Sequence, residues 1–302
     1  MPLTLRLISR LALCVALAGV CQLPAKIVRN VEKTFAVQPA GTLNAKLNGG
    51  DIVIKTADIA EVRVTVRETI QADDDRKADE LLKDLTLRLE QQGNDITAEA
   101  RYEGPMLSGW FRGRTPVSVD FFVTVPRQFH LSLTTSGGDI RSEGLQGSVR
   151  GTTSGGDIVL GAVAGPVVAK TSGGDIRLQE CTDSTELTTS GGDIRAGRVD
   201  GRAALITSGG DIEATLGSEA SQEAQLETSG GDVQLHVPAK RAFLLDARTS
   251  GGTVSAAGLT LTIDDGAFGQ SSLKGRVNGG NALVKVRSSG GDIVIRTDGA
   301  AN

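Results

Sequence analysis

The sequence predicts an all-β fold, a single-chain β-solenoid (β-helix) with rungs of about 18 residues. A Ser-Gly-Gly-Asp-Ile block recurs at a fixed interval of 18 residues, and such a period indicates stacked repeats. The composition agrees, because 39 glycines and only 3% aromatic residues suit a thin stacked core. The regular copies begin at Ser136, Ser154, Ser172, Ser190 and Ser208, and looser copies begin at Asn48, Ser229, Ser250, Asn278 and Ser289.

Residues 1–25 have the pattern of a secretory signal peptide. Arg6 and Arg10 supply positive charge, and the apolar run 11–20 is too short to span a bilayer. Cys21 leaves lipid anchoring as an alternative to simple cleavage. We expect a protein exported to the periplasm, the cell envelope or the extracellular space, with no transmembrane span after cleavage.

Charge and cysteine content narrow the function further. Removal of the signal takes two of the 32 basic residues, leaving 30 against 36 acidic residues, a net charge of −6. An acidic exported protein is a poor candidate for nucleic-acid binding, which needs clustered positive charge. Cys181 is the one cysteine outside the signal region, so no intrachain disulfide framework is expected.

The segment 26–116 is predicted to form a strand-rich N-terminal cap with one helix. Acidic residues at 73–75, followed by apolar residues three and four apart, predict a capped helix near 74–84. Gly93-Asn94 separates two alternating stretches and indicates a β-hairpin. Alternation also predicts strands at 31–37, 42–46, 51–55 and 61–67.

A loop at 103–116 holds the one tryptophan of the chain. Trp110, Phe111 and Arg112 form a candidate contact loop for a glycan or a membrane surface. The alternative is that Trp110 covers one end of the repeat stack.

Residues 117–298 are predicted to form the solenoid, with a short tail at 299–302. Apolar residues alternate within each half of a repeat, which predicts two short strands and two corners per rung. The Gly-Gly pair marks a corner that needs either positive φ or close backbone approach. About ten rungs fit this segment, and the stretch from Ser250 to Ser289 is expected to make two irregular ones. A β-sandwich of hairpins is the alternative fold, but hairpin loops do not keep a strict phase over five blocks. The strongest inward column is Ile140, Ile158, Ile176, Ile194 and Ile212.

Stacking places one aspartate of each rung in a row. Carboxylates about 4.8 Å apart repel each other by about 0.9 kcal/mol in water, so something must offset the repulsion. One candidate is calcium, which prefers carboxylate and carbonyl oxygens. The other is pairing with arginines two residues along the same strand, together with hydrogen bonds from corner N–H groups. The residues of this ladder are Asp139, Asp157, Asp175, Asp193, Asp211, Arg141, Arg177 and Arg195.

No catalytic constellation is visible in the sequence. His130 and His236 are the only histidines, too few for a histidine-rich metal site, and neither a metal site nor a cofactor is expected. Cys181 occupies an inward position of its rung and is expected to be core. A regular row of Asp and Arg could still resemble the site of a polysaccharide-acting enzyme built on a β-helix.

The repeats carry a resemblance to a known family. Leu43-Asn44-Ala45-Lys46-Leu47-Asn48-Gly49-Gly50-Asp51-Ile52, the strand from Val119 to Pro126 and the Ser-Gly-Gly-Asp-Ile blocks together resemble the "putative adhesin" family, domain of unknown function 4097. The resemblance covers roughly residues 40 to 298 and implies a bacterial exported β-solenoid without catalytic residues. The segments at 251–254 and 278–281 depart from the motif.

The sequence therefore favours a non-enzymatic protein of the cell envelope or surface, an adhesin or scaffold. Its expected partner is an envelope component or a surface glycan. The alternatives are a polysaccharide-acting enzyme and a calcium-stabilised β-roll.

Overall fold

The computed structural model describes residues 26–105, 115–218, 221–263 and 268–297. The predicted signal peptide with Cys21, the predicted contact residues Trp110, Phe111 and Arg112, and the tail at 299–302 lie outside the described residues.

The N-terminal part contains the predicted helix and hairpin. Asp74 caps the helix, because its carboxylate accepts a hydrogen bond from the backbone N–H of Lys77 at 2.8 Å. The two strands on either side of Gly93, Leu85–Gln92 and Asp95–Tyr102, pair antiparallel as predicted. The elements are β1 (Lys26–Ala36), β2 (Gly41–Leu47), β3 (Ile52–Ala57), β4 (Glu61–Gln71), α1 (Asp75–Leu82), β5 (Leu85–Gln92) and β6 (Asp95–Tyr102).

The following strands are short and regularly spaced. They are β7 (Val117–Pro126), β8 (Phe129–Thr134), β9 (Ile140–Ser142), β10 (Leu145–Gln146), β11 (Val149–Thr152), β12 (Ile158–Ala164), β13 (Val167–Lys170), β14 (Ile176–Cys181), β15 (Thr185–Thr188), β16 (Ile194–Val199), β17 (Ala203–Ile206), β18 (Ile212–Leu216), β19 (Ala224–Glu227) and β20 (Val233–Val237). The last part holds β21 (Phe243–Thr249), β22 (Val254–Ala257), β23 (Leu261–Thr262), β24 (Phe268–Gly269), β25 (Ser272–Val277), β26 (Leu283–Ser288) and β27 (Ile293–Thr297).

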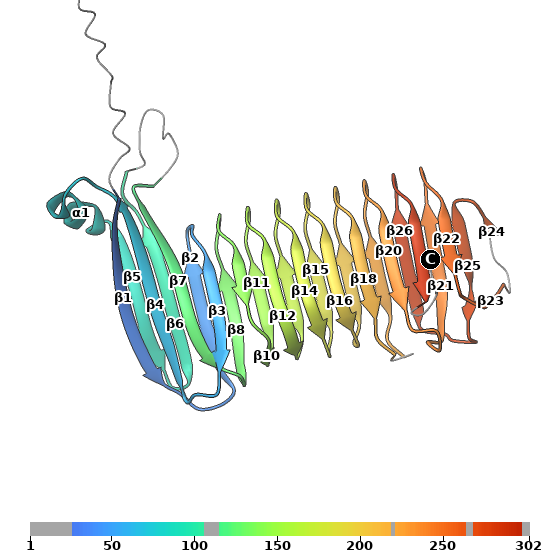
Figure 1. Ribbon diagram of the computed structural model, residues 1–302, viewed down its shortest axis with the longest axis horizontal. Helices are drawn as coiled ribbons and strands as arrows, with labels where there is room; N and C mark the ends of the chain where they lie inside the picture. Colours follow the sequence, from blue (N-terminus) through green and yellow to red (C-terminus); the bar gives the residue numbers. More distant parts are fainter. Residues whose placement is uncertain (1–25, 106–114, 219–220, 264–267, 298–302) are drawn as a thin grey trace, which may run out of the picture.

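These strands form a rod built from two long sheets (Figure 1). Sheet A runs in the order β1-β4-β7-β3-β9-β12-β14-β16-β18-β20-β27-β22, with β10 beside β12. Sheet B runs β23-β25-β21-β26-β19-β17-β15-β13-β11-β8-β2-β6-β5, with β24 beside β25. Each rung gives one strand to each sheet, and successive rungs pair parallel and in register, as Ile158 with Ile176. The predicted β-solenoid is confirmed.

Identical side chains stack inside the rod. Ile140, Ile158, Ile176, Ile194 and Ile212 follow one another along sheet A, and each is 0% exposed. A single layer of side chains from each sheet fills the space between the sheets. Because one rung cannot cover its own apolar side, neighbouring rungs supply the burial that stabilises it.

The outlying motif at Asn48 belongs to the stack. The β2/β3 rung lies between the β6/β7 and β8/β9 rungs and pairs parallel with both. The expected boundary at residue 117 therefore does not separate a cap from the solenoid. A narrower cap remains, in which β1 and β4 extend sheet A antiparallel and β5 extends sheet B.

The stretch from Ser250 to Ser289 does not make the two irregular rungs expected from the sequence. It contributes β22 to one rung and β26 to another, and between these two strands in the sequence β25 runs antiparallel to β21 and covers that end of sheet B. Asn278 and Gly279 adopt left-handed φ values of 49° and 71°, so this Gly-Gly copy is a turn and not a rung corner.

Ten rungs are stacked within the described residues, over roughly 45 Å at the usual strand spacing. Their order along the rod is β6/β7, β2/β3, β8/β9, β11/β12, β13/β14, β15/β16, β17/β18, β19/β20, β26/β27 and β21/β22. Among the described residues, the helix is too short and too polar to cross a membrane.

Candidate functional site

The Gly-Gly corners hold the rungs in register. A Cβ atom at the second glycine of a pair would collide with the previous rung, as at Gly174, where it would lie 2.1 Å from the carbonyl oxygen of Gly156. At the first glycine, Gly173, the nearest atom would be 3.5 Å away. Neither glycine has a left-handed φ, so close backbone approach is what this corner requires.

A buried row of hydroxyls fastens each corner to the one before it. The Thr171 hydroxyl donates to the carbonyl oxygen of Gly156 at 2.9 Å and accepts from the N–H of Gly174 at 3.4 Å. Most rungs repeat the first bond, and the side chains that make it are buried. The equivalent hydroxyls belong to Thr135, Thr153, Thr189, Thr207, Thr228, Thr249 and Ser288.

Replacing Thr171 by valine is expected to lower the free energy of unfolding by about 1 kcal/mol or more, because the two backbone groups lose their buried partner. Thr171→Ser keeps the hydroxyl and is the control. Urea unfolding followed by circular dichroism measures both, and equal losses for the two variants would contradict a role for the hydroxyl.

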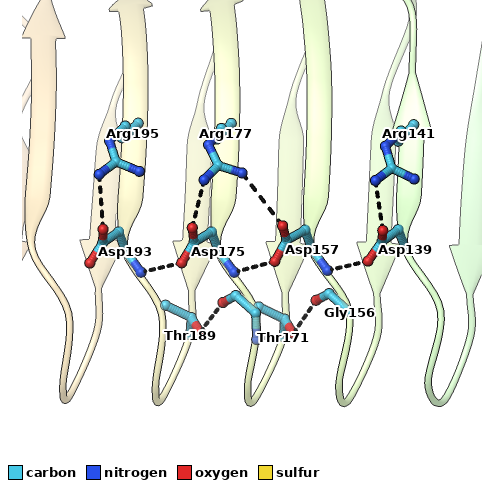
Figure 2. Close-up of polar contacts among 11 residues, drawn as sticks. Asp139, Arg141, Gly156, Asp157, Thr171, Asp175, Arg177, Thr189, Asp193 and Arg195 are labelled. Carbon is cyan, nitrogen blue, oxygen red and sulfur yellow. Dashed lines mark hydrogen bonds and ion pairs between the residues drawn. The ribbon is translucent and has the colours of Figure 1, made fainter.

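The aspartates form the predicted row and bond the rungs to one another (Figure 2). One carboxylate oxygen, Oδ1, accepts a hydrogen bond from the backbone N–H of the aspartate in the next rung. Asp157 thus donates to Asp139 at 2.8 Å, and Asp175 donates to Asp157 at 2.9 Å. The full row is Asp120, Asp51, Asp139, Asp157, Asp175, Asp193, Asp211, Asp232 and Asp292, and it ends at Thr253.

The second oxygen, Oδ2, pairs with the predicted arginines. Arg141 lies 2.7 Å from Asp139 and Arg195 lies 2.9 Å from Asp193. Arg177 contacts Asp175 at 2.6 Å and, diagonally, Asp157 at 3.5 Å (Figure 2). These pairs are partly exposed, so the N–H bonds of the row outweigh them as a source of stability. Together the two kinds of bond offset the repulsion between stacked carboxylates.

Sequence reasoning missed the beginning of this row. Asp120 accepts from the N–H of Asp51 at 3.0 Å, and Arg67 of β4 pairs with its other oxygen at 2.9 Å. The only signal was the Asp120-Phe121 pair, which takes the place of Asp-Ile but has no Gly-Gly before it. The arginine pattern also stops after Asp193, because Glu213, Gln234 and Val294 occupy the corresponding positions in later rungs.

A shallow groove of about 480 Å³ lies beside the aspartate row on the outer face of sheet A. Rung-to-rung pairing skips Gly161, Gln179 and Gly197, so successive strands are irregular at the same place. Arg177 and Arg195 line the groove, together with Ser142, Leu178, Glu213 and Thr215.

Cys181 and His130, which the sequence also singled out, lie in the framework of the rod. Cys181 is fully buried, and burial raises the pKa of its thiol, which disfavours the reactive thiolate. His130 accepts a hydrogen bond from the backbone N–H of Ser148 at 3.0 Å through Nδ1 and is half-buried. Across the described part of the chain, no three His, Cys, Asp or Glu side chains gather in a metal-binding cluster.

Solved structures of low sequence identity resemble the chain. A "putative adhesin" from Bacteroides fragilis is 10% identical, with 89% of this chain and 97% of that chain covered and a TM-score of 0.41. A "putative cell adhesion protein" from Clostridium sporogenes is 13% identical, with 89% and 100% covered and a TM-score of 0.25. A "putative adhesin" from Parabacteroides distasonis is 12% identical, with 89% and 97% covered and a TM-score of 0.39. No curated protein matches the chain.

The family comparison covers nearly the whole rod. The model called Toastrack, domain of unknown function 4097, matches residues 42–296, from the beginning of β2 to the end of β27. The match therefore includes residues of every rung, and it agrees with the resemblance noted from the repeat motif. The chain belongs to the Toastrack family.

Proposed function

We propose that this protein is a non-enzymatic component of the cell envelope or surface, an adhesin or scaffold that binds its partner along the outer face of sheet A. The observation that carries the proposal is the constant register of the rungs, which repeats similar side chains at about 4.8 Å along a rigid rod. A repeated surface gives many weak contacts with an extended ligand, and their sum can be strong.

The aspartate row and the groove beside it offer the most suitable contacts. A guanidinium has five N–H donors, and Arg195 gives one of them to Asp193, which leaves donors for a ligand. Because the aspartates hold the arginines in place, a ligand would lose less side-chain entropy on binding. Hydroxyl and carboxylate groups of a surface glycan or another envelope polymer fit such donors and acceptors.

Export is the second part of the proposal and rests on the N-terminal sequence. The basic residues at positions 6 and 10 and the short apolar run after them support a signal peptide. Removal of this segment would leave β1 at the beginning of the mature protein.

A calcium-stabilised roll is a weaker proposal, because the Oδ1 atom of each aspartate in the row already accepts a backbone N–H. Asp175, for example, accepts the N–H of Asp193 with one oxygen and pairs with Arg177 through the other. We expect the melting temperature of the mature protein to be the same in millimolar calcium and in excess chelator. An upward shift with calcium, measured by differential scanning calorimetry, would restore the calcium proposal.

A glycan array probed with the mature protein tests the proposed binding. The double variant Arg177→Gln/Arg195→Gln is expected to lose the bound glycans. Arg150→Gln/Lys170→Gln removes the same charge from the outer face of sheet B and is expected to bind like the unmodified protein. If the two double variants bound the glycans equally well, the groove would no longer be part of the proposal. Cleavage of any bound polysaccharide would overturn the non-enzymatic function.

A further inference from the structure

The last rung in the sequence is not the last rung of the rod. The β26/β27 rung lies between β19/β20 and β21/β22 in both sheets, although the chain completes those two rungs first (Figure 1). The C-terminal rung therefore occupies a slot between two rungs that are already joined to each other by residues 238–242.

The slot holds this rung by the same bonds that join the regular rungs. Asp292 donates its N–H to Asp232 at 2.7 Å and accepts the N–H of Thr253 at 2.7 Å. The Ser288 hydroxyl donates to Gly231 at 2.9 Å, and the Thr249 hydroxyl donates to Gly291 at 2.7 Å. The row of acceptors is thus continuous through the inserted rung.

Charged side chains of the C-terminal rung match both walls of the slot. Lys285 pairs with Glu227 of β19 and thereby lowers the pKa of that carboxyl. Arg287 pairs with Asp246 of β21 at 2.8 Å. Burial alone would raise the pKa of Asp246, but the hydrogen bond and charge of Arg287 outweigh it, and the pKa is lowered.

The two walls also fit each other without the inserted rung. In sheet B, Gln225 and Asp246 both align with Lys285, and Glu227 and Arg248 both align with Arg287. Direct stacking of β21 on β19 would therefore set Glu227 beside Arg248, opposite charges, and keep the apolar residues inside. The corners at Ser229 and Ser250 are 21 residues apart, the same spacing as that between the corners at Ser208 and Ser229. The strands β19 and β21 therefore have compatible neighbours both when β26 lies between them and when they pair directly.

A short connection delivers the C-terminal rung to the slot. The turn after β25 crosses the start of β21, where the Asn278 side-chain amide donates to the carbonyl oxygens of Ala239 and Arg241, both at 3.0 Å. The backbone of Gly280 packs so closely on Ala242 and Phe243 that a Cβ atom would lie 2.0 Å from the nitrogen of Phe243. These contacts, the amide clamp of Asn278 and the close packing of Gly280, fix the connection against the segment that leads into β21.

We propose that the slot between β19/β20 and β21/β22 also accepts the β26/β27 rung of a second copy of this chain, so that copies associate by exchanging C-terminal rungs. The bonds to Asp232, Thr253, Glu227 and Asp246 are the same whichever copy supplies the rung, so only the short connection and the protein concentration distinguish the two arrangements. The exchange joins rods through a complete rung, with no unpaired strand edge between them.

Cysteine crosslinking of the mature protein tests the exchange. Gln234 and Val294 are register partners in β20 and β27, at a spacing that permits a disulfide. The variants Gln234→Cys and Val294→Cys are mixed, unfolded in urea, refolded together at increasing concentration and oxidised. A disulfide-linked dimer that increases with concentration is expected. Arg177→Cys with Val159→Cys, register partners in the central rungs, is the control and should stay monomeric.

Two further variants test the register of the rungs and the role of the Asn278 clamp separately. The double variant Gln234→Cys/Val294→Cys, oxidised at low concentration, should form an internal disulfide, which verifies the register independently of exchange. Asn278→Gly keeps the backbone conformation accessible but removes the amide clamp, and is expected to increase the exchanged fraction. If the internal disulfide forms but the mixed variants give no more dimer than the control pair, the exchange proposal is overturned.

Discussion

Substituting alanine for Gly174 is expected to lower the free energy of unfolding by about 3 kcal/mol or more. The added methyl group would lie 2.1 Å from the carbonyl oxygen of Gly156 in the previous rung. A flexible side chain could move aside, but a backbone carbonyl in the middle of a ladder cannot. Relief would require the two corners to separate, which would lengthen the bonds that Thr171 and Asp175 make across the same gap.

The neighbouring glycine provides the control. Gly173 adopts no left-handed φ, and its added Cβ atom would meet nothing closer than 3.5 Å. Gly173→Ala is therefore expected to change stability by less than about 1 kcal/mol, and its smaller unfolded-state entropy acts in favour of folding. Urea unfolding with fitted m-values measures both variants. A similar loss for the two would mean that the corners do not pack as closely as the structure shows.

The rung itself could be predicted from the sequence because its signals are local. The spacing of the isoleucines determines which residues share a face, and the Gly-Gly-Asp corner determines where the strand direction changes. The Asp–Arg pairs followed from the same logic, since Arg177 lies two residues after Asp175 on one strand. The sequence predicted that each carboxylate accepts a hydrogen bond from a corner N–H group. It did not identify which N–H group donates, because the donor lies in another rung.

The order of the rungs could not be predicted, because it depends on pairing between distant segments. All copies of the motif present the same ladder of bonds, so nothing local states that Asp51 stacks on Asp139 or that Asp292 stacks on Asp232. The Gly-Gly pair at Asn278 also serves a turn with left-handed φ, a use that the dipeptide alone does not distinguish from a corner. The repeats therefore predict that the rungs stack into a rod, but they do not predict the order in which the rungs stack.

The aspartate row should respond more to loss of its backbone acceptor than to loss of its charge. Asp175→Ala removes the acceptor for the Asp193 N–H and the partner of Arg177, and is expected to lower the free energy of unfolding by about 2–3 kcal/mol. Asp175→Asn keeps a side-chain oxygen for that N–H and loses mainly the partly exposed ion pair, so about 1 kcal/mol or less is expected.

A third variant shows how much a surface ion pair outside the row contributes to stability. Asp58 pairs with Arg127 at 2.8 Å on the surface and lies outside the row, so Asp58→Ala should cost little. Added salt should shrink the difference between Asp175→Asn and the unmodified protein, because salt screens the ion pair, while the loss in Asp175→Ala should persist. If the alanine and asparagine variants of Asp175 were equally unstable, charge and not the carboxylate-to-backbone bond would hold the row together. In that case the rungs after Asp193, in which no arginine follows the row aspartate by two residues, should be the first to lose hydrogen-exchange protection.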